Sequence, residues 1–257
     1  MKLLSPSLLV CAALALSACG GSGGSGDGSP LQPGNPNPPG QNPPPQEPPS
    51  QPPPPNTDPY VIEYHGDSTI WGWETGTSGA RVGTPAPTAF ANALPSTPQN
   101  EVRNLGINGS TACGLLEGAN GQETWATKMA ESNATHVILN HGINDSSNGA
   151  VGYDVPRYRS CLTQLAAIAR ANGKEVVFET PNPIAGSRMD DYVVAMRSVA
   201  ATQQPAIPVI DQHQYLTDFL AGRDVHEIVP DGAHPSQQTY IMKGEYAAQR
   251  FMAIFPR

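Results

Sequence analysis

The stretch Val61-Ile62-Glu63-Tyr64-His65-Gly66-Asp67-Ser68 joins a short apolar run to a glycine-containing turn that ends at a serine. A short run of this composition, not interrupted by turn residues, is typical of a buried strand in a parallel sheet. A serine that leaves a strand at a sharp turn can present its hydroxyl group at the edge of the sheet. We therefore interpret Ser68 as a candidate nucleophile and look for its partners at the ends of other strands.

Four more short apolar runs follow, and stretches with helical spacing separate them. The predicted strands are Val61–Tyr64, Glu101–Leu105, His136–Leu139, Glu175–Phe178 and Val209–Ile210. Apolar residues at helical spacing predict helices near 85–94, 158–172, 190–202 and 236–255. This alternation predicts an α/β fold, an open parallel sheet with helices on both faces. Ligands of such sheets bind at the carboxyl ends of the strands.

The N-terminal residues have the pattern of an export signal. Lys2 is followed by an apolar run, Leu3 to Leu16, which is too short to span a bilayer stably. The ending Leu16-Ser17-Ala18-Cys19 resembles the bacterial lipobox, which implies a signal peptide at 1–18 and a lipid on Cys19. Gly20 in the next position favours the outer membrane, with the folded domain in the periplasm or at the cell surface. The alternative is an ordinary signal peptide that releases a soluble protein.

Residues 19–59 have a composition that cannot form a core. Gly and Ser dominate up to residue 29, and 15 of the 28 prolines lie between Pro30 and Pro59. The first part predicts a flexible coil and the second an extended polyproline II linker. The remaining segment, 60–257, is long enough for one domain with a real core.

Charge and cysteine content narrow the function classes for residues 60–257. The whole chain has a net charge of −8 and no basic run, which excludes nucleic acid as an expected partner. Cys113 and Cys161 are the two cysteines of the domain, and they form either a disulfide or a pair of buried thiols. Their spacing indicates no metal site, and we expect no metal or cofactor.

Four polar blocks follow predicted strands or precede the last helix. They are Gly66-Asp67-Ser68, the segment from Asn104 to Thr111, the segment from Asn140 to Asp145, and Asp231-Gly232-Ala233-His234-Pro235. In order and spacing these blocks resemble those of the SGNH (GDSL-type) hydrolase superfamily, over essentially all of 60–257. The resemblance implies a three-layer α/β/α sandwich with a five-stranded sheet in flavodoxin-like order. It also implies a lipoprotein-type esterase that acts on carboxylic esters.

The residue types in these blocks suit acyl transfer. A serine hydroxyl needs a base, and His234 can take the proton of Ser68 while Asp231, three residues earlier, orients the imidazole. The oxyanion formed on the ester needs donors that are already in place. The resemblance implies the Ser68 N–H, the Gly106 N–H and the Asn144 side-chain amide. Taken singly, Gly106 could be only a turn and Asn144 only a helix cap.

The substrate is less well defined by the sequence. Trp71, Trp73 and His141 are candidate pocket residues, although packing explains the two tryptophans equally well. The expected export and the absence of a long apolar lid favour short acyl groups, such as acetyl, on carbohydrate. A lysophospholipase, lipase or thioesterase that acts on longer acyl chains is the main alternative.

Two further classes stay open. Asp67, Asn140, His141 and His234 could in principle gather a metal for a phosphoesterase, but the paired Asp/His spacing of such enzymes is absent. A non-catalytic lipoprotein that uses the fold only for binding is the other alternative. The four intact blocks favour the enzyme over both. The oligomeric state does not follow from the sequence.

Overall fold

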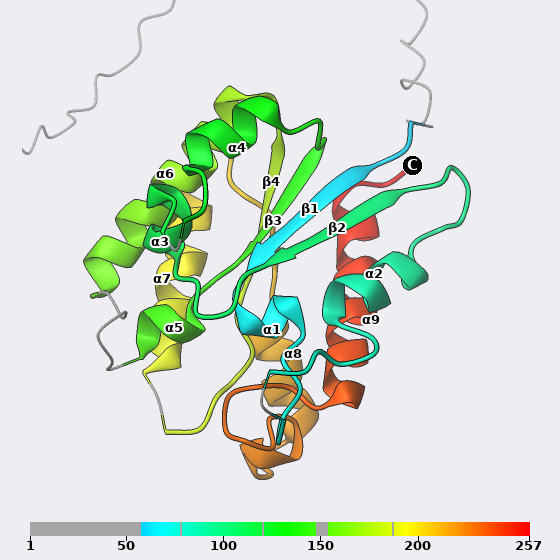
Figure 1. The fold of residues 1–257 in the computed structure, drawn as a ribbon, viewed down its shortest axis with the longest axis vertical. Coiled ribbons are helices and arrows are strands. Elements are labelled where there is room, and N and C mark those ends of the chain that lie inside the picture. The colour runs from blue at the N-terminus through cyan, green and yellow to red at the C-terminus, as the bar shows by residue number, and fades with distance from the viewer. Residues whose placement is uncertain (1–57, 78, 120, 148–153, 187) are drawn as a thin grey trace, which may run out of the picture. The chain divides into compact units, whose positions relative to one another are not determined.

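The computed structural model describes residues 58–257 except 78, 120, 148–153 and 187 (Figure 1). The expected signal peptide at 1–18, the lipidation site Cys19 and all but the last two residues of the linker at 19–59 lie outside this part. Within the described residues, no helix is both long and apolar enough to cross a membrane.

Five parallel strands form one sheet, and each lies where the sequence predicts a strand. Their order across the sheet is β2-β1-β3-β4-β5, the predicted flavodoxin-like order. The strands are β1 (Val61–Gly66), β2 (Glu101–Gly106), β3 (His136–Asn140), β4 (Glu175–Glu179) and β5 (Val209–Ile210). Except for β5, they extend the predicted runs by one or two residues at their carboxyl ends, because glycine and polar residues also take part in the strand pairing there.

Helices connect the strands. The four predicted helices are confirmed as α2 (Ala86–Ala93), α6 (Val155–Ala171), α7 (Met189–Thr202) and α9 (Gln237–Ile254). The shorter helices, which the sequence analysis does not predict, are α1 (Ser68–Trp71), α3 (Ala112–Glu117), α4 (Trp125–Glu131), α5 (Ile143–Ser146) and α8 (Gln212–Leu220), with a 3₁₀ turn at Val225–Glu227. Apart from the nine-residue α8, these segments have at most seven residues, too few for a helical stripe to show in the sequence.

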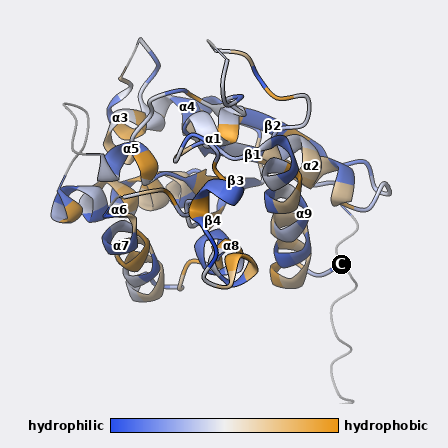
Figure 2. Ribbon diagram, turned by 90° about the horizontal axis from the view of Figure 1, so that it is seen from below, coloured by the Kyte–Doolittle hydropathy of each residue, from blue (hydrophilic) through white to orange (hydrophobic). Residues whose placement is uncertain are grey.

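Helices cover both faces of the sheet, so the fold is the predicted three-layer α/β/α sandwich. Figures 1 and 2 show α2 and α9 on one side and α6 and α7 on the other. Successive side chains of a strand point to opposite faces of the sheet, so each strand contributes to both layers of helices. Ile62 and Tyr64 of β1 pack in the core under α9, while Val137 and Leu139 of β3 pack under α6. Both cores are dominated by fully buried apolar side chains.

A disulfide joins two helices on the α6 side of the sheet. Cys113 in α3 and Cys161 in α6 are bonded, with an S–S distance of 2.10 Å. Closing a loop with a sequence separation of 48 residues stabilises the fold by about 4 kcal/mol in the chain-entropy model. Of the two alternatives, the cysteines therefore adopt the oxidised one.

The strand order fixes where a ligand can bind. After β1 the chain passes to β2 on one side of the sheet, and after β3 it passes to β4 on the other side. The two connections therefore diverge at the carboxyl ends of β1 and β3. A crevice opens at such a switch point. Ser68 follows β1 and Asn144 follows β3, so both candidate residues lie at this crevice.

Candidate active site

The turn that carries Ser68 is built from the residues on either side of it. Asp67 caps α1, and its Oδ1 accepts hydrogen bonds from the backbone N–H and the hydroxyl of Thr69, each at 2.8 Å. A Cβ atom at Gly66 would lie 2.5 Å from the carbonyl oxygen of Asn140, so only glycine fits at the end of β1. These contacts hold Ser68 as the first residue of α1, at the carboxyl edge of the sheet.

Ser68, His234 and Asp231 form one chain of hydrogen bonds. The distance from Ser68 Oγ to His234 Nε2 is 2.9 Å, and His234 Nδ1 lies 2.8 Å from Asp231 Oδ2. The other carboxylate oxygen of Asp231 accepts the backbone N–H groups of Ala233 and His234 at 3.0 and 2.7 Å. Partial burial raises the pKa of Asp231, but these hydrogen bonds and the imidazole lower it below its ordinary value. Asp231 is therefore ionised at neutral pH and fixes the imidazole so that Nε2 faces the serine.

The loop that carries His234 is attached to two other segments. The side-chain amide of Asn182 donates to the carbonyl of Ala233 at 3.2 Å, and Ala185 N–H donates to the carbonyl of Gly232 at 2.8 Å. The Trp73 ring stacks on the imidazole of His234 with centroids 5.6 Å apart and an interplanar angle of 28°. The histidine is thus held on one face by an aromatic ring and through its backbone by the segment after β4.

The loops after β2 and β3 are tied together beside Ser68. Asn144 donates one side-chain amide hydrogen to the carbonyl of Ser110 at 2.9 Å, and Asp145 accepts the N–H of Ala112 at 3.0 Å. Burial raises the pKa of Asp145 to about 7. The second amide hydrogen of Asn144 stays available, because the Nδ2 group carries two donors. Asn144 therefore combines a structural bond with a donor near the hydroxyl of Ser68.

The assignment of Gly106 as an oxyanion donor is wrong in this structure. Its N–H already donates to Asn104 Oδ1 at 3.1 Å, and it lines a different hollow from the one that contains Ser68. A Cβ at this position would lie 2.2 Å from the backbone nitrogen of Trp71. Glycine is needed here because β2 packs directly against the backbone of α1.

A second glycine of the same block, Gly109, was missed as a candidate. Its φ of 75° is in the left-handed region, and no atom lies within 4 Å of the position a Cβ would take. Its N–H has no hydrogen-bond partner among the described residues, and it precedes Ser110, the residue held by Asn144. The Asn108-Gly109 pair, which is a turn signal, could have pointed to this position.

Replacing Gly106 by alanine is expected to destabilise the fold by about 1–3 kcal/mol, because the new methyl group meets backbone atoms that cannot rotate away. Urea unfolding measures the change. Gly83→Ala is the matched control, since a Cβ there would meet its nearest atom at 3.7 Å and its φ is ordinary. Equal unfolding midpoints for the two variants would show that β2 and α1 are not in close contact.

Ser68 and His234 open onto a hollow of about 360 Å³. Two isoleucines, Ile143 and Ile184, supply its apolar side chains, and neither was predicted from the sequence. The other lining residues are small or polar: Ser68, Asn144, Ser146, Ser147, Gly186, Ala233 and His234. The hollow is therefore a small chamber beside the nucleophile, with an apolar part and a hydrogen-bonding part.

Two of the three predicted pocket residues lie elsewhere. His141 is completely buried, with its Nε2 atom 3.2 Å from Ser110 Oγ, and burial lowers its pKa to about 3. It therefore supports the Ser110 loop and does not line the hollow. Trp71 lines the neighbouring hollow that contains Gly106. Trp73 touches the site only through its stacking on His234. The sequence gives no signal for side-chain direction in the irregular segment that follows α1.

The residues proposed for a metal do not gather. The described part of the chain contains no group of three or more His, Cys, Asp or Glu side chains that could hold a metal ion. His234 is hydrogen-bonded to Ser68 and to Asp231, and His141 is hydrogen-bonded to Ser110. Asp67 caps α1. The donor set thus fits acyl transfer by a serine better than metal-assisted phosphoester hydrolysis.

The fold is that of an α/β/α hydrolase, with a candidate active site at the carboxyl ends of the strands, and comparison with known proteins gives its family. Residues 64–240 match the model of the GDSL-like Lipase/Acylhydrolase family. The chain belongs to this family, as its resemblance to SGNH hydrolases implied, and it is a hydrolase of ester bonds. A search of curated proteins found no matching sequence.

Several solved structures share the fold at low sequence identity. A putative lipolytic protein of the G-D-S-L family from Desulfitobacterium hafniense is 19% identical, with a TM-score of 0.57 over 76% of this chain and 99% of that one. A catalytic mutant of Axe2, an acetylxylan esterase from Geobacillus stearothermophilus, is 17% identical, with a TM-score of 0.59 over 79% and 97%. LAE5, an α/β hydrolase from the metagenome of Lake Arreo, is 20% identical, with a TM-score of 0.57 over 76% and 94%.

Proposed function

We propose that the protein is a serine esterase that removes short O-acyl groups, in particular acetyl, from carbohydrate through an acyl-enzyme intermediate. The observation that carries the proposal is the hydrogen-bonded chain of Ser68, His234 and Asp231 at the mouth of a small hollow. A nucleophile, a base within hydrogen-bond reach and an orienting carboxylate are the parts that nucleophilic acyl transfer needs.

Each group has a defined step in this mechanism. His234 Nε2 takes the proton of Ser68 Oγ as that oxygen attacks the ester carbonyl, and Asp231 stabilises the imidazolium that forms. His234 then returns the proton to the departing sugar hydroxyl, which leaves the acyl group on Ser68. A water molecule, deprotonated by the same imidazole, releases the acid and restores the serine.

The negative charge on the carbonyl oxygen requires donors beside Ser68. We assign to this task the N–H groups of Ser68 and Gly109, which have no partner among the described residues, and the second amide hydrogen of Asn144. The Ser110 carbonyl, held by Asn144, fixes the amide and the Gly109 turn relative to each other. Removal of one such donor typically costs about 3 kcal/mol of barrier.

The hollow supports a short acyl group. A volume of about 360 Å³ shared between the acyl chain and part of the alcohol leaves little room for a fatty acid. Ile143 and Ile184 provide an apolar surface for a methyl group, while the serines and Asn144 surround the reacting ester. The solved acetylxylan esterase shows that a protein of this fold can act on an acetyl ester.

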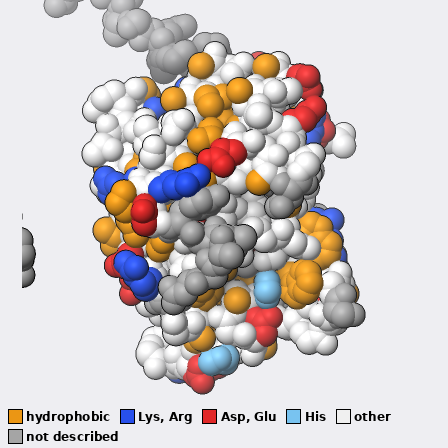
Figure 3. All heavy atoms as spheres, turned by 60° about the vertical axis from the view of Figure 1, so that its left-hand side comes forward, with side chains coloured by type: hydrophobic (Ala, Val, Ile, Leu, Met, Phe, Trp, Pro, Cys, Tyr) orange, Lys and Arg blue, Asp and Glu red, His pale blue; other side chains and the backbone are white. Residues whose placement is uncertain are grey.

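We propose, from the pattern of the N-terminal residues, that the enzyme is exported and held at the outer membrane through a lipid on Cys19. The Cys113–Cys161 disulfide supports export, because disulfides persist mainly in oxidising compartments. On the face in Figure 3, acidic and basic side chains lie near one another and form no single basic area, as suits an uncharged substrate.

A series of p-nitrophenyl esters tests the acyl length. We expect kcat/KM to be highest for acetate and at least ~10-fold lower for octanoate, since each misplaced methylene costs about 1–3 kcal/mol of transition-state binding. Release of acetate from acetylated polysaccharides is measured in parallel. The Ser68→Ala variant serves as the blank. A maximum at octanoate or longer would assign the protein to the lipase or thioesterase alternative instead. No hydrolysis of any ester would favour the non-catalytic binding protein.

A further inference from the structure

A groove runs along the sheet face beside β1 and β2, away from the hollow of Ser68. Two neighbouring hollows of about 270 and 300 Å³ form it, and they share His65, Leu105 and Lys128. We call this surface the lateral groove. Its defining residues are Glu63, His65, Trp71, Arg81, Arg103 and Lys128. β2 is an edge strand of the sheet, and the groove is lined by residues of β1 and β2 together with Lys128 and Glu131 of α4.

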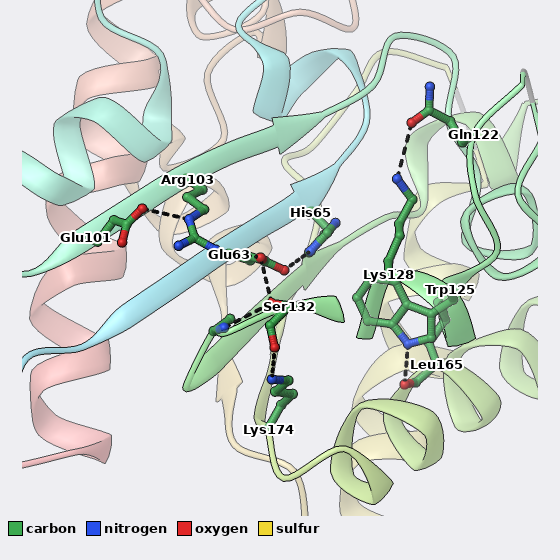
Figure 4. A network of polar contacts seen from close by, with 11 residues as sticks. Glu63, His65, Glu101, Arg103, Gln122, Trp125, Lys128, Ser132, Leu165 and Lys174 are labelled. Atoms are coloured by element: carbon green, nitrogen blue, oxygen red, sulfur yellow. Dashed lines mark hydrogen bonds and ion pairs between the residues drawn. The ribbon is translucent and has the colours of Figure 1, made fainter. Parts of the chain in front are cut away.

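The floor of the lateral groove is a rigid polar network (Figure 4). The Glu63 carboxylate accepts hydrogen bonds from Arg103 Nη1 at 3.1 Å and from Ser132 Oγ at 2.7 Å, and it lies 3.2 Å from His65 Nε2. The His65 ring packs edge-on against Trp125, with centroids 4.8 Å apart. Glu63 and His65 are only 6% and 2% exposed, so their side chains are held in one geometry.

This network leaves one hydrogen-bond acceptor of His65 unused. Burial raises the pKa of Glu63, but the hydrogen bonds from His65, Ser132 and Arg103 lower it to about 2, so the carboxylate is ionised. Burial lowers the pKa of His65, which is therefore neutral and donates its Nε2 hydrogen to Glu63. Nδ1 is then an acceptor. It has no partner among the described residues, and Figure 4 shows it on the side of the ring away from Glu63.

The lining of the lateral groove suits an uncharged ligand with many hydroxyl groups. Three basic side chains are matched by three acidic ones: Arg81, Arg103 and Lys128 against Glu63, Glu123 and Glu131. Lys128 makes one hydrogen bond, to Gln122 Oε1 at 3.2 Å, and has further hydrogens to donate. Trp71 and the 38%-exposed Leu105 add apolar surface for the C–H groups of a sugar ring.

Aromatic rings lead from the lateral groove to the nucleophile. Trp71 ends the helix that Ser68 begins, and its ring centroid lies 6.2 Å from that of Trp73. The ring of Trp73 in turn stacks on His234. A chain molecule bound in the groove can therefore extend across these rings to the site of ester cleavage.

We propose that the lateral groove binds glycosyl residues of the polysaccharide chain whose acyl ester is attacked by Ser68. The inference rests on the proposed function and adds to it that the substrate is a neutral chain of several sugar units. Residues of the groove contribute to binding of the chain and take no part in the chemistry. The groove would thus distinguish a polymeric ester from a small one.

The test compares a long substrate with a small one in the same variants. For the unaltered protein, we expect kcat/KM on acetylated xylo-oligosaccharides to rise with chain length from one to several sugars. Lys128→Met and Arg81→Met are expected to lower kcat/KM on the longest of them about 10-fold, a loss of about 1.4 kcal/mol. Both variants should keep the unaltered rate on p-nitrophenyl acetate. Arg250→Met, exposed on α9 beyond the other face of the sheet, is the matched control.

A second measurement tests binding to the lateral groove without catalysis. Isothermal titration of the Ser68→Ala protein with deacetylated xylo-oligosaccharides should show binding that Lys128→Met weakens. Rates that do not rise with chain length, or equal losses on both substrates, would overturn the proposal. Either result leaves the proposed esterase intact if Ser68→Ala still abolishes hydrolysis of p-nitrophenyl acetate. If Ser68→Ala keeps that activity, the proposed function fails first.

Discussion

Ser68→Ala is expected to lower kcat for p-nitrophenyl acetate at least ~10³-fold, because no other hydroxyl of the described residues is hydrogen-bonded to His234 and activated by it. His234→Ala should have an effect of similar size, since the serine then keeps its proton. Asp231→Asn should cost about 10⁴-fold through the loss of the correct imidazole tautomer. These effects should appear in kcat more than in KM, because the three residues act on the transition state.

The control for these variants is Ser160→Ala, which removes a hydroxyl from the exposed side of α6. It should keep the unaltered rate. Circular dichroism and urea unfolding establish that the three site variants fold, and steady-state rates are then compared at equal folded concentration. Rates within threefold of the unaltered protein for either Ser68→Ala or His234→Ala would refute the serine mechanism.

The order of elements and the strand ends could be predicted from the sequence for a physical reason. Buried parallel strands need runs such as Val61–Tyr64 and His136–Leu139, and few other segments of a polar domain can supply them. Side chains that follow such runs meet at one edge of the sheet, whatever the lengths of the loops between them. This is why Ser68 and Asn144 could be placed together without knowledge of any distance.

Other parts of the site depend on tertiary packing, which produces no periodic pattern in the sequence. Gly106 ends β2, and Gly109 lies three residues later in the loop that follows. Only the contact of β2 with the α1 backbone shows that Gly106 is needed for packing while Gly109 forms an open turn. His141 follows a strand like the other candidates, but its side chain turns inward to Ser110. The direction of a side chain after a strand end is set by tertiary contacts, which spacing does not encode.

Lys243 is the clearest residue that the sequence analysis missed. It lies on α9 among apolar positions and is completely buried, with its Nζ donating to Asn182 Oδ1 at 3.0 Å. The Asn182 amide in turn holds the Ala233 carbonyl, next to His234. A single lysine in an amphipathic helix normally marks the solvent side, so its burial could not be read from the pattern.

Two buried carboxyl groups, those of Asp67 and Glu179, interact electrostatically with Lys243, and the pKa of each is raised on balance. Burial raises the pKa of Asp67 and of Glu179, and the positive charge of Lys243 acts in the opposite direction on both. Burial likewise lowers the pKa of Lys243, which the two carboxylates oppose. Asp67 shapes the turn of Ser68, and Glu179 accepts a hydrogen bond from Asn140 at 2.9 Å. Lys243 thus interacts with the buried polar groups that support the turn of Ser68 and the loop of His234.

Lys243→Met should lower the free energy of unfolding by about 1–3 kcal/mol, since it leaves the buried Asn182 Oδ1 atom without the donor that Lys243 supplies. Urea unfolding at neutral pH measures the loss. The double variant Lys243→Met/Glu179→Gln should recover part of it, because the second substitution removes one of the two buried carboxyl groups whose ionised form Lys243 favours. Arg250→Met, exposed on the same helix, should change stability by less than about 0.5 kcal/mol.

The Lys243→Met variant also distinguishes a role of Lys243 in stability from a role in positioning His234. Without its contact to Asn182, the Ala233 carbonyl loses part of its support, so kcat of the folded Lys243→Met protein should fall several-fold while KM changes little. Glu179→Gln alone keeps the Asn182 contact and should keep kcat near that of the unaltered protein. A Lys243→Met protein with unaltered kcat would mean that the lysine stabilises the fold without positioning His234. A loss of stability under about 0.5 kcal/mol would mean that neither Asn182 nor the two carboxyl groups depend on Lys243.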